Sequence, residues 1–293
     1  MKLFAVLSDG VAPLPVPAGV TDFDALYEQL SGVVPGVYSV LRTFAGNKFL
    51  DLDGHIARLR HSMAGLGWPE TLLDEAALRR ALHQVCSAYP APEARVRFDF
   101  LAEPGLTVGT SSRLLLAVMP FTPPPPELYE QGVALGVAKG LTRERPLLKT
   151  ADFPPQRRAY SRQTHTNYYE YLLLDKQGYI LEGTGSNFYA VRDGVVYTAE
   201  SGILAGITRR IILDLLPPLG IPLRLEPVHI DEIGRLDEAA MSSSSRALLP
   251  VVAIEEQTVG DGHPGPVSRR ILAAYQEYVS SAVTTAVTPP PTN

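Results

Sequence analysis

The amino-acid sequence predicts a mixed α/β chain, in an α+β arrangement, that folds as a smaller N-terminal domain and a larger C-terminal domain. Its 293 residues are enough for two medium-sized domains, each with its own hydrophobic core. Helix and strand patterns occur on both sides of a proline-rich run that begins at Pro120. Such a run cannot continue a helix or an inner strand and is typical of a stiff spacer. We therefore expect domains over residues 1–119 and 129–281, a linker over 120–128 and a disordered tail over 282–293.

In the first domain, apolar periodicity and turn residues predict a hairpin flanked by helices and further strands. The hairpin should turn at Ala45-Gly46-Asn47, because glycine and asparagine suit the backbone of a tight turn. Asp53 is the expected N-cap of the first long helix, which should end at Gly67. The expected elements are helix 23–30, strands 36–44 and 48–50, helices 55–66 and 72–89, and strands 95–101 and 112–119.

The second domain shows more strands than helices. A hydroxyl-rich segment, Met241 to Ser245, lies between two apolar stretches, so it is either a plain linker or a loop that faces a polar ligand. The expected elements are strands 132–138, 169–175, 187–192, 195–198, 221–228 and 248–254, and helices 208–216 and 267–279.

The composition argues against several classes of function. A formal charge of −5 argues against a nucleic-acid partner. Cys86 is the only cysteine and the six histidines show no metal-binding spacing, so neither an intrachain disulfide nor a protein-bound metal is expected. No apolar run approaches the roughly 20 residues of a membrane span, and the apolar start of the chain is too short for a signal peptide. We expect a cytoplasmic protein with small-molecule partners.

Residues 149–208 contain three groups that can act together in one active site: an amine, a carboxylate and the start of a helix. Two of the five lysines lie in turns and one is terminal, which leaves Lys139 and Lys149 as candidates for a buried, nucleophilic amine. Glu182 ends a strand, and Gly206-Ile207-Thr208 begins a helix whose first amides can bind a phosphate. Each feature alone is more often structural, as a solvated glutamate or an ordinary helix start.

His55 and Arg58 lie three residues apart, and therefore on one face of the first long helix. An arginine in such a place usually forms a surface ion pair. Its planar fork also suits bidentate binding of a phosphate better than a lysine would. The spacing alone leaves both interpretations open.

Together these segments resemble the fold-type IV pyridoxal-phosphate enzymes, the class IV family of branched-chain aminotransferases, D-amino-acid aminotransferases and 4-amino-4-deoxychorismate lyases. The resemblance covers roughly residues 33–280, with the segments in the family's order. It implies pyridoxal 5'-phosphate as cofactor, a C-terminal domain built around a β-barrel-like sheet, and an active site between the domains of a homodimer. The segments that carry it are GVYSVLRTFAGNKFLDLDGHIARLRHS, LLKT, YILEGTGSNFYAVRDGVVYT, GILAGITRR, MSSSSRALLPV and GDGHPGPVSRRILAAY.

The resemblance also implies roles for individual residues. Lys149 matches the lysine that forms the Schiff base with the cofactor, and Glu182 matches the glutamate on the pyridine nitrogen. The remaining implied roles are binding of the phosphate by Arg58, Ile207, Thr208 and Ser244, and binding of the substrate by Tyr38, Arg97 and Ser245.

The sequence departs from the family pattern at several positions. Ser39 stands where the family usually has glutamate, and Phe153 where it has tyrosine. Val34-Pro35-Gly36 replaces Gly-Asp-Gly. Phe98-Asp99-Phe100 replaces the Thr-Arg-Gly of D-amino-acid aminotransferases, so the usual arginine for D-specificity is missing. Arg97 could bind a substrate carboxylate or pair with a neighbouring acid.

The resemblance therefore implies a transferase of amino-acid metabolism. We expect an aminotransferase in which Lys149 moves a proton between the substrate Cα and the cofactor, with a branched-chain amino acid and a 2-oxo acid as substrates. One alternative is a 4-amino-4-deoxychorismate lyase, which the small Ser39 favours, whereas the segment EGTGSN favours transamination. A second alternative is a non-catalytic homologue that binds the cofactor without turnover.

Overall fold

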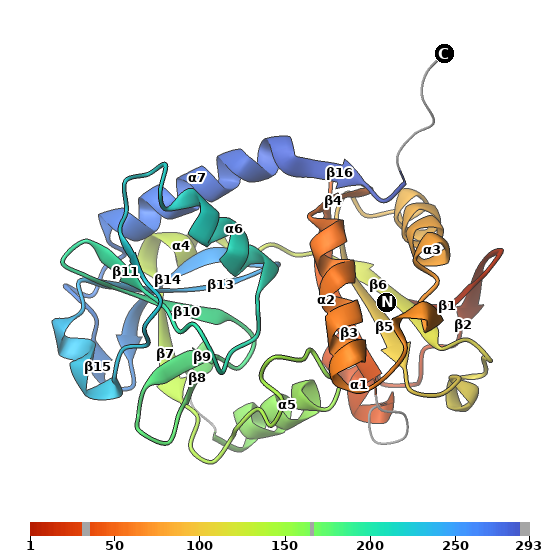
Figure 1. Cartoon of the computed structure of the whole chain (residues 1–293), viewed down its shortest axis with the longest axis horizontal. Helices are drawn as coiled ribbons and strands as arrows, with labels where there is room; N and C mark the ends of the chain where they lie inside the picture. The colour runs from red at the N-terminus through yellow and green to blue at the C-terminus, as the bar shows by residue number, and fades with distance from the viewer. Residues whose placement is uncertain (31–35, 165–166, 288–293) are drawn as a thin grey trace. The chain divides into compact units, whose positions relative to one another are not determined.

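The computed structural model describes residues 1–30, 36–164 and 167–287. The chain divides into two compact units (Figure 1). The first unit comprises Met1–Thr122, Leu148–Arg158 and Ala282–Asn293, and the second comprises Pro123–Leu147 and Ala159–Ser281. The sequence predicted two contiguous domains, whereas each unit here is assembled from separate stretches of chain. Lys149 consequently belongs to the first unit, although it follows the proline-rich run.

The first unit is built on a seven-stranded sheet in the order β16-β4-β3-β5-β6-β1-β2. All the neighbouring strands in it pair antiparallel. The hairpin of β1 and β2 was not predicted, because Pro13 and the other early prolines obscure the strand pattern; Pro13 lies on an edge strand, where a missing amide is tolerated. The strands are β1 (Lys2–Leu7), β2 (Gly10–Leu14), β3 (Gly36–Phe44), β4 (Lys48–Leu50), β5 (Ala94–Leu101), β6 (Leu114–Pro120) and β16 (Val283–Thr285).

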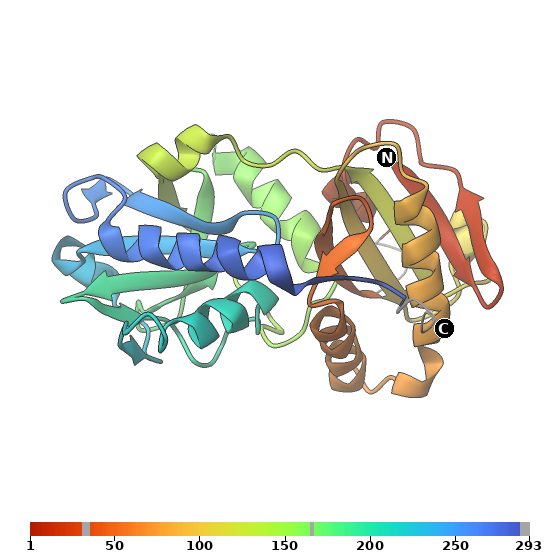
Figure 2. The same cartoon turned by 90° about the horizontal axis from the view of Figure 1, so that it is seen from above.

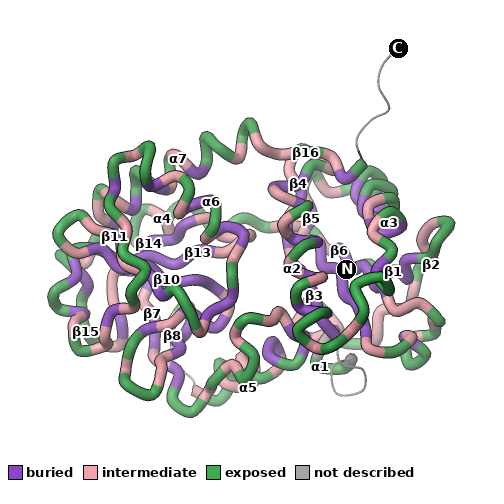
Figure 3. Tube along the Cα trace, viewed as in Figure 1, coloured by how far each residue is buried: buried purple, intermediate pink, exposed green. Residues whose placement is uncertain are grey.

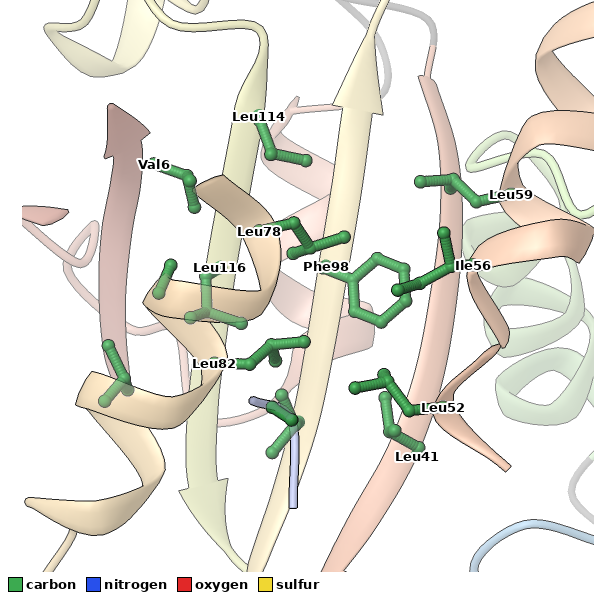
Figure 4. Packing of buried hydrophobic residues seen from close by; sticks show 14 of the residues in the cluster. Val6, Leu41, Leu52, Ile56, Leu59, Leu78, Leu82, Phe98, Leu114 and Leu116 are labelled. Atoms are coloured by element: carbon green, nitrogen blue, oxygen red, sulfur yellow. The ribbon is translucent and has the colours of Figure 1, made fainter. Parts of the chain in front are cut away.

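Two long helices cover this sheet and bury its core. Helix α2 (Leu52–Gly65) packs against β3, and α3 (Glu75–Ser87) packs against β1 and β6. Ile56 of α2 lies beside Phe98 of β5, Leu59 belongs to the same buried cluster, and Leu82 of α3 lies over the same sheet (Figure 4). Helix α1 (Phe23–Leu30) and the short 3₁₀ turns η1 (Glu70–Leu72) and η2 (Leu106–Val108) complete the unit.

Helix α1 has the predicted bounds, whereas the starts predicted for α2 and α3 were wrong, and capping explains both differences. Asp51, not Asp53, caps α2, because its side chain accepts from the Gly54 amide (3.2 Å). Asp74 caps α3 by accepting from the Ala77 amide (2.8 Å), so this helix begins at Glu75 rather than at 72. A side-chain acceptor for the first amides decides where a helix begins more strongly than apolar spacing does.

The second unit contains a nine-stranded sheet that closes into a barrel. The strand order β10-β13-β14-β7-β8-β9 returns to its start, because Glu182 of β9 pairs with Asn187 of β10. This confirms the barrel-like sheet that the family resemblance implied. The strands are β7 (Val133–Val137), β8 (Glu170–Leu174), β9 (Ile180–Gly183), β10 (Asn187–Arg192), β11 (Val195–Tyr197), β12 (Leu223–Arg224), β13 (Glu238–Ser243), β14 (Ala247–Ile254) and β15 (Gln257–Thr258).

Helices surround this barrel. Helix α4 packs against β14 and α6 against β13, while the long α7, blue in Figures 1 and 2, runs along the strands. The buried residues follow the strands in each unit (Figure 3). Within the described ranges, no helix is long and apolar enough to cross a membrane. The helices are α4 (Pro126–Gln131), α5 (Phe153–Thr164, which runs from the first unit into the second), α6 (Ile207–Leu215), η3 (Ile230–Arg235) and α7 (Pro266–Ala282).

The structure also differs from the predictions for the linker, for one strand and for the C-terminal tail. The linker does not run as an extended spacer to residue 128, since α4 begins with Pro126, whose missing amide is not needed in a first helical turn. The strand expected over 221–228 is only the two-residue β12. The expected disordered tail contains β16, which pairs with β4; residues 288–293 lie outside the described part of the chain.

Candidate active site

Lys149 is fixed through its backbone in the first unit. Its carbonyl accepts a hydrogen bond from the Tyr38 amide (3.0 Å), and its own amide donates to Ser62 Oγ of α2 (3.0 Å). Thr150 forms an antiparallel bridge with Val37 at the start of β3. Main-chain contacts to β3 and α2 therefore fix the backbone of this residue.

The ring of Tyr38 contacts two cationic groups. Its centroid lies 4.8 Å from Lys149 Nζ and 3.7 Å from Arg97 Cζ. Arg97 is fully buried and donates to the Asp99 carboxylate from Nε (3.1 Å) and from Nη2 (3.0 Å). Of the two roles that the sequence left open for Arg97, the structure shows the pairing with a neighbouring acid.

Ser62 links the predicted lysine to the predicted phosphate-binding arginine. Its hydroxyl donates to the Arg58 carbonyl (3.0 Å) and accepts from the Lys149 amide (3.0 Å). Arg58 Nη2 donates to Ser39 Oγ (2.9 Å), which lies 2.8 Å from His55 Nδ1. Burial lowers the pKa of His55 well below its ordinary value, and the charges of Arg58 and Lys149 lower it further. The imidazole is therefore neutral at physiological pH.

Glu182 lies in the second unit, on β9 at the closure of the barrel. Its buried carboxylate accepts from the Leu204 amide (3.1 Å) and from Asn187 Nδ2 (3.5 Å) through Oε2. Its other oxygen, Oε1, lies 2.9 Å from Arg143 Nη1. For Glu182 to bind a protonated ring nitrogen, that nitrogen would have to share the carboxylate with Arg143.

The first turn of α6 contains Ile207 and Thr208, both buried. Gly206 is the N-cap and provides no side-chain acceptor, while the first amides of a helix have no acceptor within it. A Cβ on Gly206 would lie 2.0 Å from Asn187 Oδ1, so this position requires glycine. Asn187 also donates to the Leu204 carbonyl (2.9 Å), which ties this segment to the strands that position Glu182. The arrangement fits a ligand with a phosphate and a basic ring nitrogen.

Ser244 and Ser245 are half-buried in the turn between β13 and β14. Arg246 completes this turn and donates to Ser243 Oγ (2.9 Å) from Nε and to the Gly185 carbonyl (3.0 Å) from Nη2. Its Nη1 pairs with Glu170. The hydroxyl-rich segment is therefore a hairpin turn braced by an arginine rather than a linker.

Glu170, the first residue of β8, joins that turn to the loop after β9. Its Oε1 accepts from the Gly185 amide (2.7 Å) and from Ser186 Oγ (2.7 Å), and its Oε2 accepts from Arg246. Burial alone would raise the pKa of Glu170, but the charge and hydrogen bond of Arg246, with the bonds from Gly185 and Ser186, lower it below its ordinary value. The carboxylate therefore stays ionised although it is buried.

Sequence reasoning missed Arg143, Glu170 and Arg246. Glu170 begins an apolar stretch and Arg246 directly precedes one, and isolated charges in such places are often paired; this was the available signal. Arg143 belongs to an arginine-rich stretch that gives no such hint. Phe153, at the position of the family's tyrosine, is buried at the start of α5.

Comparison with known proteins identifies the family. Residues 36–254 match the family model described as amino-transferase class IV, and the chain belongs to this family. Over 253 residues the chain is 28% identical to a D-alanine aminotransferase of Bacillus licheniformis, which covers 84% of this chain and 88% of the relative. It is 36% identical over 112 residues to a branched-chain-amino-acid aminotransferase of Pseudomonas aeruginosa. This match covers 38% of this chain and 36% of the relative.

Solved structures show the same fold. The branched-chain aminotransferase of Escherichia coli is 26% identical, with a TM-score of 0.71 over 86% of this chain and 90% of that one. A branched-chain aminotransferase from T.th., crystallised with pyridoxamine 5'-phosphate, has a TM-score of 0.76 over 98% of each chain at 21% identity. The predicted fold-type IV architecture and the prediction of an aminotransferase are thus confirmed.

Proposed function

We propose that this protein is a pyridoxal-phosphate-dependent aminotransferase that moves the amino group of a branched-chain-like amino acid to a 2-oxo acid. The main support is that the Ser62 hydroxyl ties the backbone of Lys149 to the backbone of Arg58, so the residues that carry a candidate Schiff-base amine and a candidate phosphate-binding guanidinium are neighbours in the first unit. The family of the chain and the pyridoxamine 5'-phosphate in a structural relative support the same cofactor.

The proposed binding roles follow the family resemblance. Arg58 and Ser244 would bind the phosphate with their side chains, and the first turn of α6 would bind it through the backbone amides of Ile207 and Thr208. Glu182 would bind the ring nitrogen. Each of these groups is polar and is held by strands or helices rather than by a long loop.

The bound cofactor would supply an aldehyde carbon that accepts the amino group and a ring that absorbs electrons from the substrate. Lys149 would hold it covalently at rest and, once released by the substrate, move a proton between the substrate Cα and the C4' carbon. Glu182 would keep the ring nitrogen protonated. Tyr38 and Ser245 would position the substrate; the ring centroid of Tyr38 lies 4.8 Å from Lys149 Nζ.

Two observations favour a branched-chain-like substrate. The chain lacks the Thr-Arg-Gly of D-specific relatives, and the residue at the arginine position, Asp99, is engaged by Arg97. Because Asp99 holds the buried Arg97 in a pair, this guanidinium is not presented as a lone positive charge to a substrate carboxylate. The structural relatives that act on branched-chain amino acids agree with this choice.

A transamination assay tests the proposal. The purified protein with pyridoxal phosphate is given 2-oxoglutarate and, one at a time, L-leucine, L-valine, L-isoleucine or D-alanine, and glutamate is measured by chromatography. The proposal predicts glutamate formation with the three L-amino acids and none with Lys149→Ala. Turnover of D-alanine alone would contradict the substrate assignment.

The small residue at Ser39 keeps the lyase as a second candidate. The product that it releases would distinguish a lyase from an aminotransferase. A lyase would release pyruvate from 4-amino-4-deoxychorismate without any added 2-oxo acid. We also propose a homodimer, because the family resemblance implies an active site near a dimer interface, and we keep the expectation of a cytoplasmic location. Light scattering after size exclusion should give twice the chain mass of 31.8 kDa.

A further inference from the structure

We propose that Ser39 is a positioning residue that aims the Arg58 guanidinium at the cofactor phosphate by relaying its hydrogen bond to the neutral ring of His55. The inference rests on the proposed function, since it concerns how this chain holds pyridoxal phosphate. It assigns a role to a position where the chain departs from the family's usual glutamate.

The three side chains form a short chain of hydrogen bonds. Arg58 Nη2 lies 2.9 Å from Ser39 Oγ and 3.4 Å from His55 Nδ1, and Ser39 Oγ lies 2.8 Å from the same Nδ1. Ser39 is fully buried on β3 and His55 is almost fully buried on α2. A buried network of this kind restricts the arginine to one orientation, because moving it would leave polar atoms unpaired in the core.

The direction of the bonds follows from the chemistry of the groups. A guanidinium can only donate, so Ser39 Oγ accepts from Arg58 and its own hydrogen points elsewhere. His55 Nδ1 faces the hydroxyl and the arginine, both donors, so it is the unprotonated nitrogen and the ring carries its proton on Nε2. Arg58 therefore donates a hydrogen bond to Ser39, and Ser39 donates one to His55.

A neutral relay has a consequence for phosphate binding. Ser39 and His55 both lack a charge, so these contacts orient the guanidinium without cancelling its positive charge. A carboxylate at position 39 would form an ion pair with Arg58 and compete with a phosphate for the same N–H groups. The serine should therefore raise the affinity for the cofactor through its phosphate group in particular.

The experiment compares pyridoxal phosphate with pyridoxal, which lacks the phosphate. Both are titrated by absorbance into the wild-type protein, Ser39→Ala, Ser39→Cys, Arg58→Met and Ser39→Ala/Arg58→Met, with Ser268→Ala of the second unit as a matched buried-serine control. The variants Ser39→Ala and Ser39→Cys should raise Kd for pyridoxal phosphate about tenfold, the scale of a hydrogen bond to a charged group. The Kd for pyridoxal should change less than about twofold, since pyridoxal has no phosphate for Arg58 to grip. The control should change neither.

The double variant separates positioning from a general packing effect. If Ser39 acts through Arg58, introducing Ser39→Ala into Arg58→Met should raise the Kd for pyridoxal phosphate less than about twofold, because the effects of coupled residues are not additive. An equal loss of affinity for both ligands, an unchanged Kd for pyridoxal phosphate, or a full effect in the Arg58→Met background would each overturn the inference. If the wild-type protein bound neither ligand, the proposed function itself would fail, and the inference with it.

Discussion

The ion pair between the buried Glu170 and the half-buried Arg246 gives a quantitative test of how the second unit is held together. Replacing one partner of a buried ion pair costs roughly 3–5 kcal/mol, because the other charge stays buried and unpaired. In Arg246→Met, Glu170 keeps the hydrogen bonds from the Gly185 amide and Ser186 Oγ, each 2.7 Å long, so we expect a loss near the lower end, about 3 kcal/mol. At about 2–4 °C per kcal/mol, the melting temperature should fall by roughly 6–12 °C.

The pH dependence of this loss identifies its cause. In the wild type the pKa of Glu170 is lowered by Arg246 and its other partners, so the carboxylate stabilises the fold above its unfolded pKa and this contribution is lost as the pH falls. In Arg246→Met, burial acts without the opposing cation, so the pKa of Glu170 should rise above the unfolded value. Protonation then relieves the penalty as the pH falls. The difference in stability between the two proteins should therefore narrow from about pH 7.5 to about pH 5.

Urea unfolding at both pH values measures these free energies. The double variant Glu170→Gln/Arg246→Met serves as the control, because it leaves no unpaired charge and should be more stable than Arg246→Met alone at neutral pH. A pH-independent loss, together with a double variant as unstable as the single one, would refute the explanation and point to lost packing around the Arg246 side chain instead.

Two further predictions concern Cys86 and Glu238. Burial raises the pKa of the Cys86 thiol to about 12, so the native protein should resist iodoacetamide at about pH 8 and react only after unfolding; rapid labelling of the folded protein would contradict this burial. Glu238 accepts from the Val267 and Ser268 amides (2.7 Å each) at the start of α7, so Glu238→Gln should lower the free energy of unfolding by about 1–3 kcal/mol in urea titrations, and a change below about 0.5 kcal/mol would show that the cap is not needed.

Local patterns predicted much of the fold. The hairpin of β3 and β4 has the predicted bounds, 36–44 and 48–50, because two stretches rich in apolar residues and the Gly-Asn turn between them lie next to each other in the chain. Helix α5 was missed, since Pro154-Pro155 and a run of arginines hide any apolar stripe. The barrel closure between Glu182 and Asn187 depends on strand register, and the return of β16 to β4 joins positions distant in sequence; periodicity encodes neither.

The candidate site was also predictable only in part. The order of the motifs pointed to Lys149, Arg58 and Glu182, and their assigned roles stay predictions. The structure adds the partners of these residues. The pairing of Glu170 with Arg246 joins positions 76 residues apart, and neither residue has a neighbour in sequence that reveals the other. The pairing of Arg97 with Asp99 was one of two options until the structure showed the buried contact.

The central claim is that Lys149 carries the cofactor. The purified protein is incubated with pyridoxal phosphate, treated with sodium borohydride to make any lysine linkage permanent, digested and analysed by mass spectrometry. The account predicts the added mass on the peptide that contains Lys149, and its loss in Lys149→Ala with no other lysine taking it up. Modification of Lys139 instead, the other lysine that the sequence left open, or no modification of the folded protein, would contradict it.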